Sequence, residues 1–152
     1  SVETLRAEIT AAVGRLGGLV SGFQRGSFNI DGQQRDGFQI HYALESSAGK
    51  MIPGRLDIAA LPIKPQKARR NSVYENRRDQ SIKMALYMLR VALDGMWFLQ
   101  QLSPGYAALI PWMLADGKRT VTQMWAESST MGRLLPPGDT EFVEGEIVNG
   151  KR

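Results

Sequence analysis

One stretch of the chain, from residue 64 to residue 83, carries most of its basic character. It holds seven basic residues and two acids, a local balance of +5, whereas the whole chain of 152 residues has a formal charge of +4. Arginine guanidinium groups pair well with phosphate oxygens, and a neighbouring aromatic ring can stack on a base. The pattern favours a binding site for nucleic-acid phosphates, formed by Lys64, Lys67, Arg69, Arg70, Tyr74, Arg77, Arg78 and Lys83.

The alternative interpretation of this stretch is a solvated helix end, in which the arginines pair with Glu75 and Asp79. Basic linkers are common, and this one has no fixed motif spacing. The rest of the chain sums to −1, so the basicity is one local patch and not a property of the whole protein.

Residue types that hold metals or act as nucleophiles are scarce. There is no cysteine and one histidine, His41, which excludes disulfides, thiolate metal sites and cysteine nucleophiles. Gly54-Arg55-Leu56-Asp57 looks like the first acidic strand of some metal-dependent nucleases, whose carboxylates hold magnesium. The second acidic strand is missing, because Pro62-Ile63 precede Lys64. We therefore expect no catalytic residue, no metal site and no cofactor, with a nuclease as a minor alternative.

The first sixty residues predict a helix followed by a three-stranded meander. Apolar residues at steps of three and four predict a helix from Val2 to Leu16, ended by Gly17-Gly18. From Phe23 the period becomes two, which is typical of half-buried strands. Short links with turn residues favour antiparallel neighbours: Asp31-Gly32 with Asp36-Gly37, then Ser46-Ser47-Ala48-Gly49. Three prolines bracket the last strand and predict that it is an edge: Pro53, Pro62 and Pro65.

A long helix is predicted next. Ser72-Val73-Tyr74-Glu75 has the spacing of a capping box, so the helix should run from there to about Leu102. It is polar all round up to Ser81 and nearly all apolar beyond, so we expect its second part to be buried. Arg90 and Asp94, four residues apart, should pair within that part.

The remainder predicts shorter elements. Ser103-Pro104-Gly105 should stop the long helix, and a further short helix is expected from there through Met113. Thr120-Val121-Thr122-Gln123 has the spacing of a second capping box before a last helix. We expect one α+β domain over residues 1–135 and an acidic tail over 136–152.

No targeting signal is recognisable at the N-terminus, and the most apolar stretch, Met84 to Leu99, is interrupted by charges and shorter than the ~20 residues of a membrane span. We therefore expect a cytoplasmic protein without a membrane partner.

Two segments carry a resemblance to a known family. Ala59-Ala60-Leu61-Pro62 closes the predicted meander, and the stretch from Asp79 to Leu86, with Arg90 further on, opens the long helix. With the order helix, meander, long helix, they resemble the core of phage single-strand annealing proteins of the essential-recombination-function type and their ring-forming eukaryotic relatives. The same order resembles double-stranded RNA-binding domains in outline.

The annealing-protein resemblance implies an oligomeric ring or filament. Single-stranded DNA would lie along a basic groove between the meander and the long helix. The phosphate contacts that it implies are Arg69, Arg70, Arg77, Arg78 and Lys83.

The leading hypothesis is a non-enzymatic nucleic-acid-binding protein that acts as a homo-oligomer, with single-stranded DNA as the expected ligand. The alternative, from another class, is a structural or assembly subunit of a phage particle or larger complex. In that case the apolar C-terminal helices and the acidic tail dock on neighbouring subunits, and part of the methionine and aromatic content is subunit interface.

Overall fold

The computed structural model describes residues 1–46, 48–64, 71–114 and 117–127, and within these it leaves out the side chains of residues 71–72 and 125–127. Three of the expected phosphate contacts, Lys67, Arg69 and Arg70, lie outside the described residues, as does the expected tail over 136–152.

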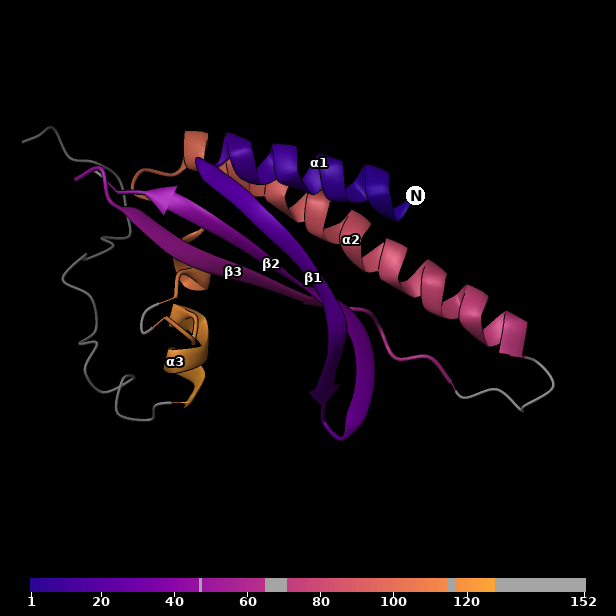
Figure 1. Cartoon of the computed structure of the whole chain (residues 1–152). Helices are drawn as coiled ribbons and strands as arrows, with labels where there is room; N and C mark the ends of the chain where they lie inside the picture. The colour runs from indigo at the N-terminus through magenta and orange to yellow at the C-terminus, as the bar shows by residue number, and fades with distance from the viewer. Residues whose placement is uncertain (47, 65–70, 115–116, 128–152) are drawn as a thin grey trace, which may run out of the picture.

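The fold is α+β, as expected. Helix α1 (Val2–Arg15) is followed by a three-stranded antiparallel sheet and the long helix α2 (Asn71–Leu102). A single 3-10 turn, η2 (Ile110–Trp112), and the short helix α3 (Val121–Glu127) complete the described chain. Figure 1 shows α1 and α2 lying side by side over one face of the sheet.

The strands β1 (Gly18–Ile30) and β2 (Gln33–Glu45) form a long hairpin, longer than the alternation from Phe23 predicts. Its turn is the expected Asp31-Gly32, in which both residues have positive φ, 52° and 78°, as a two-residue hairpin turn requires. Asp36-Gly37, which was expected in the same link, lies inside β2. That part of the prediction is wrong, because the pairing of Ile30 with Gln33 leaves only two residues for the turn.

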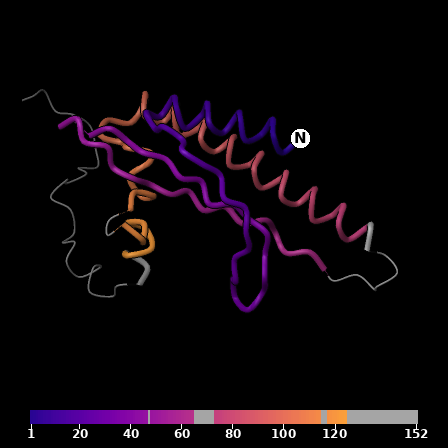
Figure 2. Tube along the Cα trace, in the orientation of Figure 1, coloured from indigo at the N-terminus to yellow at the C-terminus, as the bar shows by residue number. Residues whose placement is uncertain are grey.

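The third strand, β3 (Met51–Ala59), pairs with β2 only as far as Gly37, and the strand order is β1-β2-β3. Beyond Gly37 the hairpin continues as two strands alone, visible in Figure 2 as the projecting loop. The edge position of β3 is confirmed, although Pro53 lies within the strand and does not precede it. A backbone bridge from Met113 to Gly54 covers part of this edge.

The other edge of the sheet is β1. Its pairing with β2 is interrupted by a bulge between Val20 and Gly22, and glycine recurs further along it at Gly26. Within the described ranges, no segment pairs with its outer side.

The core lies between the sheet and the two long helices, because β2 turns alternate apolar residues toward them. Its fully buried side chains come from α1, β2, β3 and α2: Ile9, Val13, Ile40, Tyr42, Leu56, Ile82, Leu86 and Leu93. Tyr42 lies over Gly54, where an added Cβ would come within 2.3 Å of the tyrosine Cζ. Its hydroxyl donates to the Leu109 carbonyl at 3.1 Å, so it ties the chain after α2 to the sheet. Burial raises the pKa of the Tyr42 hydroxyl.

The expectation that the apolar part of α2 is buried is wrong for one side of the helix. Ile82, Leu86 and Leu93 are fully buried. On the opposite side large apolar side chains are exposed, among them Met88 and Phe98, at 55% and 59%. The fold has only two layers, so a helix of the outer layer keeps one face without a neighbour in the described chain.

Arg90 and Asp94 do pair, at 3.5 Å, as expected. The pair lies at the surface and not inside a buried half, with both side chains more than a quarter exposed. It is part of a network with α1, in which Arg90 also contacts Glu8 and Asp94 also contacts Arg15.

The expected helix from Ser103 through Met113 is wrong, because only the turn of η2 forms. Gly105 adopts a positive φ of 78° and Met113 is extended to reach β3, and both are incompatible with one continuous helix. The second capping box is confirmed. The backbone N–H of Gln123 donates to Thr120 Oγ1 at 3.1 Å, and that of Thr120 donates to Gln123 Oε1 at 3.0 Å. The first one depends on Ser72, whose side chain is outside those described.

Candidate nucleic-acid interface

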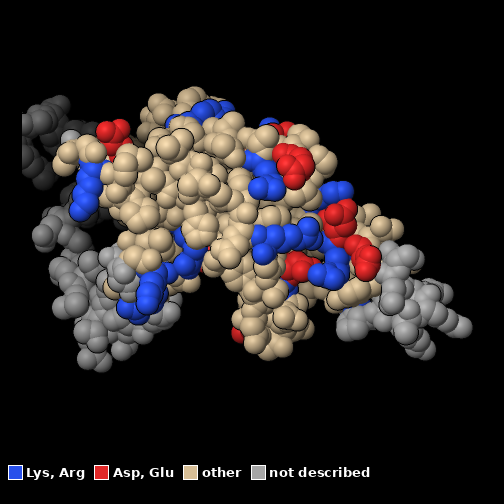
Figure 3. Space-filling view, in the orientation of Figure 1, with Lys and Arg blue, Asp and Glu red and all other residues tan. Residues whose placement is uncertain are grey.

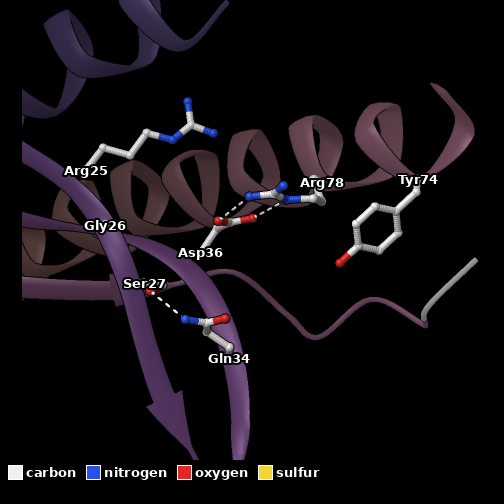
Figure 4. A pocket seen from close by; sticks show the side chains of 7 residues that line it. All are labelled: Arg25, Gly26, Ser27, Gln34, Asp36, Tyr74 and Arg78. Carbon is white, nitrogen blue, oxygen red and sulfur yellow. Dashed lines mark hydrogen bonds and ion pairs between the residues drawn. The ribbon is translucent and has the colours of Figure 1, made fainter. Parts of the chain in front are cut away.

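A polar cleft of about 420 Å³ opens between the β1–β2 hairpin and the first turns of α2. Figure 4 shows its side chains, which come from three elements. Throughout, the polar cleft means the space lined by Arg25, Gly26, Ser27, Gln34, Asp36, Tyr74 and Arg78. A second hollow of about 230 Å³ adjoins it and shares Gln34, Asp36, Tyr74 and Arg78.

The cleft exists because both the hairpin and α2 extend beyond the core. Arg25 is paired with Phe38 and Ser27 with Asp36, so alternation turns Arg25, Ser27 and Asp36 toward the helices, on the same face as buried Phe38. On this face the residue type changes from apolar to polar where β3 ends. The polar first turns of α2 lie opposite, and the space between the two is therefore lined by polar groups.

An ion pair joins the two walls of the cleft. The guanidinium of Arg78 donates from Nε to Asp36 Oδ2 and from Nη2 to Asp36 Oδ1, both at 2.8 Å. These hydrogen bonds and the charge of Arg78 hold the pKa of the Asp36 carboxyl below its ordinary value, with a smaller contribution from the charge of Arg25. The same pairing raises the pKa of Arg78. The contact fixes α2 to the hairpin across the cleft.

Two further groups give the cleft its binding chemistry. Arg25 extends from β1 toward α2 (Figure 4), with its Cζ 5.9 Å from the centre of the Phe38 ring. Tyr74 lies on the other side, half-buried, and its ring centre is 6.0 Å from Arg78 Cζ. In Figure 4 its hydroxyl points toward the hairpin. Guanidinium donors beside an aromatic ring suit a phosphate joined to a base.

The charge around the cleft is a balance and not a uniform basic patch. Three arginines, Arg25, Arg78 and Arg35, surround one carboxylate, Asp36. Arg35 lines the adjoining hollow and donates from Nε to the Ala60 carbonyl at 2.6 Å. Figure 3 shows basic and acidic side chains meeting above the hairpin, where α2 passes it. Among the described residues that line the two hollows, the excess is two positive charges.

The residues expected to form the site are divided among different surfaces. Tyr74 and Arg78 line the polar cleft. Arg77, the next residue on the helix, lines an apolar groove beside β3, because successive helical residues point about 100° apart. Lys83 pairs with Asp79 at 2.7 Å and lies toward α1. Lys64 is exposed at the end of a described range.

The interpretation of a solvated helix end, with arginines paired to Glu75 and Asp79, is therefore wrong for Arg78, which pairs with Asp36 across the cleft. Three contributors to the site, Arg25, Arg35 and Asp36, were not expected from the sequence. The register of a hairpin turning at Asp31-Gly32 would have located them, because it pairs Ser27 with Asp36.

The carboxylate considered for a nuclease site, that of Asp57, is paired with an arginine. Both oxygens of Asp57 accept from Arg55, at 2.9 and 3.1 Å, and Arg55 also donates to Gln123 of α3. Within the described part of the chain, no group of three or more histidine, aspartate or glutamate side chains is placed to hold a metal ion. Among the helices the structure describes, none has the length and apolar character to cross a membrane.

Comparison of the chain with protein-family models, with curated proteins and with solved structures finds no match. The resemblance to phage annealing proteins stays a prediction.

Proposed function

We propose that this chain is a non-enzymatic, cytoplasmic nucleic-acid-binding protein that acts as an oligomer and holds the backbone of single-stranded DNA in the polar cleft. The observation that carries the proposal is the convergence of Arg25 and Arg78, from β1 and α2, on one cleft beside the ring of Tyr74. The Arg25 guanidinium and the N–H groups of Arg78 that Asp36 does not use can donate to phosphate oxygens, and a nearby ring accepts a stacked base.

The size of the cleft favours a single strand over a duplex. Its volume of about 420 Å³ lies in the ~300–1,000 Å³ range of sites for small molecules, which suits one phosphate and its base. The resemblance noted above implies a basic groove between the meander and the long helix, and the polar cleft lies between those two elements.

Asp36 has a positioning role in this proposal. It holds the Arg78 guanidinium across the cleft through two hydrogen bonds. A phosphate that approaches Arg78 meets a preformed donor, and it also meets the negative charge of Asp36. The pair therefore orients the site and moderates its affinity.

Binding of a fluorescent oligothymidylate, followed by anisotropy between 50 and 200 mM salt, tests the proposal. The logarithm of the affinity should fall linearly with the logarithm of the salt concentration, and Arg25→Gln should reduce the slope by about 0.7, the value for one phosphate contact on a single strand. The matched control is Lys50→Gln, an exposed cation at the opposite end of the sheet. Affinity that ignores salt, or an Arg25→Gln protein that binds like the control, would refute the proposal.

The same oligonucleotide annealed to its complement extends the test. A duplex should bind more weakly than the single strand at equal salt, because a base in a duplex cannot enter the cleft to stack on Tyr74. Equal binding of the duplex and the single strand would contradict the single-strand assignment while leaving phosphate binding intact.

A second candidate function, that of an assembly subunit, is favoured by the exposed apolar side chains on α2. It predicts a multimer whose affinity for nucleic acid shows no salt-dependent, cleft-specific component. The anisotropy series, together with a mass measurement in solution, separates the two candidates.

A further inference from the structure

Seven large apolar side chains form a continuous exposed surface on α2. Their exposed fractions range from 42% to 78%. This outer stripe consists of Met84, Tyr87, Met88, Val91, Phe98, Leu99 and Leu102. At ~1.5 Å per residue it extends for about 27 Å along the helix axis.

The outer stripe is not a fringe of the core. With ~3.6 residues per turn, its centre lies roughly opposite the side of α2 that carries Ile82, Leu86 and Leu93, which are fully buried against α1 and the sheet. A helix at the surface of a two-layer domain ordinarily presents polar residues on that outer side.

Charged groups are absent from this surface along its described length. Between residues 84 and 102 the chain has two charged side chains, Arg90 and Asp94. Both face α1, where they pair with Glu8 and Arg15. An uncharged apolar stripe of this length on an exposed helix is the surface expected for a protein interface.

The spacing of the stripe indicates what kind of partner fits it. Met84, Met88, Val91, Gly95, Phe98 and Leu102 follow one another at alternating steps of four and three residues. This mean repeat of 3.5 residues is the seam along which two helices pack. The partner surface is therefore an α-helix, and the described part of the chain leaves this seam uncovered.

We propose that the outer stripe is the contact surface for α2 of a second copy, packed antiparallel about a two-fold axis. An antiparallel pair centred near residue 93 places Met84 opposite Leu102, Met88 opposite Phe98 and Val91 opposite Gly95. An added Cβ at Gly95 would meet nothing within 4 Å, so Gly95 offers room for a valine from the partner. Such self-complementarity is what a two-fold interface requires.

The exposed area fits a stable dimer. Seven side chains of this size, each about half exposed, present on the order of 700 Å² per chain, against ~800 Å² per partner in a standard interface.

Two grooves lie on either side of the first part of the stripe, both include Met84, and they provide space for the partner's side chains there. One, of about 500 Å³, lies toward β3 and includes Ile58, Leu61 and Met88. The other, of about 610 Å³, lies toward α1 and includes Leu5 and Tyr87, with the charged Glu8, Lys83 and Arg90 at its walls. The ridge of the stripe between two hollows matches the ridges-into-grooves packing of paired helices.

This proposal deepens the proposed function, because it names the surface on which the oligomer forms. None of the seven side chains lines the polar cleft. Dimerisation and DNA binding can therefore fail separately, and each has its own measurement.

Sedimentation of the full chain without nucleic acid tests the interface. The wild type should have the mass of a dimer, and Val91→Glu or Phe98→Glu should raise the dimer dissociation constant at least ~100-fold, because an unpaired carboxylate would be buried in each copy. The matched control is Leu19→Glu, which places the same charge at a 67% exposed leucine on β1. Circular dichroism should change little in all three variants, because the mutated side chains are exposed in the monomer. The melting temperature should depend on protein concentration in the wild type and the Leu19→Glu control, and should lose that dependence in the two stripe variants.

The orientation is tested by cross-linking, which the absence of native cysteine makes unambiguous. A mixture of Met84→Cys and Leu102→Cys chains should form an intermolecular disulfide on oxidation, while each variant alone should not. Linkage of Met84→Cys with itself would overturn the antiparallel arrangement.

A wild type that stays monomeric at about 100 µM would overturn the self-association proposal. Coverage of the stripe by another segment of the same chain would also give this result. If salt-dependent DNA binding persists in such a monomer, the cleft proposal stands without the oligomer. If the dimer forms but Arg25→Gln binds DNA like the wild type, the cleft proposal fails and the interface stands.

Discussion

Replacing Asp36 by asparagine should strengthen the binding of single-stranded DNA while weakening the fold. The carboxylate of Asp36 accepts two hydrogen bonds of 2.8 Å from Arg78 and is the one acid that lines the polar cleft. Asparagine retains the size of the side chain and removes its charge. Arg78 then has its full charge available to a phosphate in the cleft.

The expected changes in DNA affinity and in stability follow from the charges of Asp36 and Arg78. Two unit charges about 4 Å apart in water-like surroundings interact by ~1 kcal/mol, so removal of the Asp36 repulsion should raise affinity about five-fold at low salt. One further phosphate contact should steepen the salt slope by about 0.7, which reduces this advantage roughly three-fold between 50 and 200 mM salt. The side chains of Arg78 and Asp36 are 44% and 20% exposed. Solvent screening therefore limits the stability lost with this ion pair to ~0.5–1 kcal/mol.

The assay is the anisotropy titration with the same oligothymidylate, together with a thermal melt of each protein. The matched control is Asp94→Asn, on α2, whose carboxylate is 28% exposed and pairs with Arg15 and Arg90 away from the cleft. Both variants gain one unit of net charge, and both should melt at most a few degrees lower, at ~2–4 °C per kcal/mol. Only Asp36→Asn should bind DNA more tightly. Equal affinities of the two variants, or weaker binding by Asp36→Asn, would refute the reasoning.

The pH dependence of this effect has a defined sign. Arg78 holds the pKa of Asp36 below its ordinary value, so the stability from the ion pair is present above the ordinary carboxyl pKa and is lost only as the pH falls through the lowered value. Between pH 5 and pH 8 the affinity ratio of Asp36→Asn to wild type should therefore stay constant. A ratio that approaches one near pH 5 would mean that the pKa of Asp36 is raised and not lowered.

Two further substitutions test the packing that positions these surfaces. Gly54→Ala would bring a Cβ within 2.3 Å of Tyr42 Cζ and should lower the free energy of unfolding in urea by at least ~2 kcal/mol. The control is Gly14→Ala, which has nothing within 4 Å of the added Cβ and should be neutral or slightly stabilising. Equal effects of the two substitutions would contradict the close packing of the tyrosine. Thr120→Ala removes the hydroxyl that accepts from the backbone N–H of Gln123 at 3.1 Å. Hydrogen exchange at that N–H should accelerate by about five-fold, in line with ~1 kcal/mol for a helix cap. Thr120→Ser retains a hydroxyl and should retain the protection.

The fold was predictable where local chemistry determines it. The helix over α1 and the alternation of the strands follow from side-chain periods, because one face of each element must meet the core. The turn at Asp31-Gly32 and the cap at Thr120 follow from groups within a few residues of each other. The turn and the cap depend on short-range geometry alone, and the helix and strands show in the repeat of apolar residues along a single element.

Asp36-Gly37 shows where local chemistry misleads. The dipeptide is typical of a turn, but at Gly37 an added Cβ would lie 2.4 Å from the Phe28 ring. The glycine is required there by the Phe28 ring on β1 and by the Ile58 carbonyl oxygen on β3, which would also lie 2.4 Å from that Cβ, and not by its own backbone conformation. Such a cause involves a residue that is distant in sequence, so the dipeptide alone could not distinguish the two uses.

The burial of α2 was overestimated for a related reason. An apolar sequence indicates that a surface will be covered, but it does not say whether the cover belongs to the same chain. Leu86 and Met88 are alike in hydrophobicity, yet one is fully buried and the other is 55% exposed. The difference arises from the number of layers in the fold.

The candidate site was half predictable. The basic stretch in the sequence, with its one aromatic ring, located Arg78 and Tyr74, which lie on one helix. It could not find Arg25 and Asp36, because their contribution depends on cross-strand register and on where β3 stops. A sequence window also cannot separate Arg77 from Arg78, although they face different surfaces.

The two edges of the sheet differ, and this difference affects how copies can associate. The outer side of β3 is partly covered by the Met113 bridge, whereas no segment that the structure describes pairs with the outer side of β1. A long open strand is a template for aggregation, and a bulge with interspersed glycine and arginine makes it a poor one. The bulge between Val20 and Gly22 thus disfavours growth of the sheet from copy to copy. Association through helices then gives a closed pair in place of an open-ended ribbon.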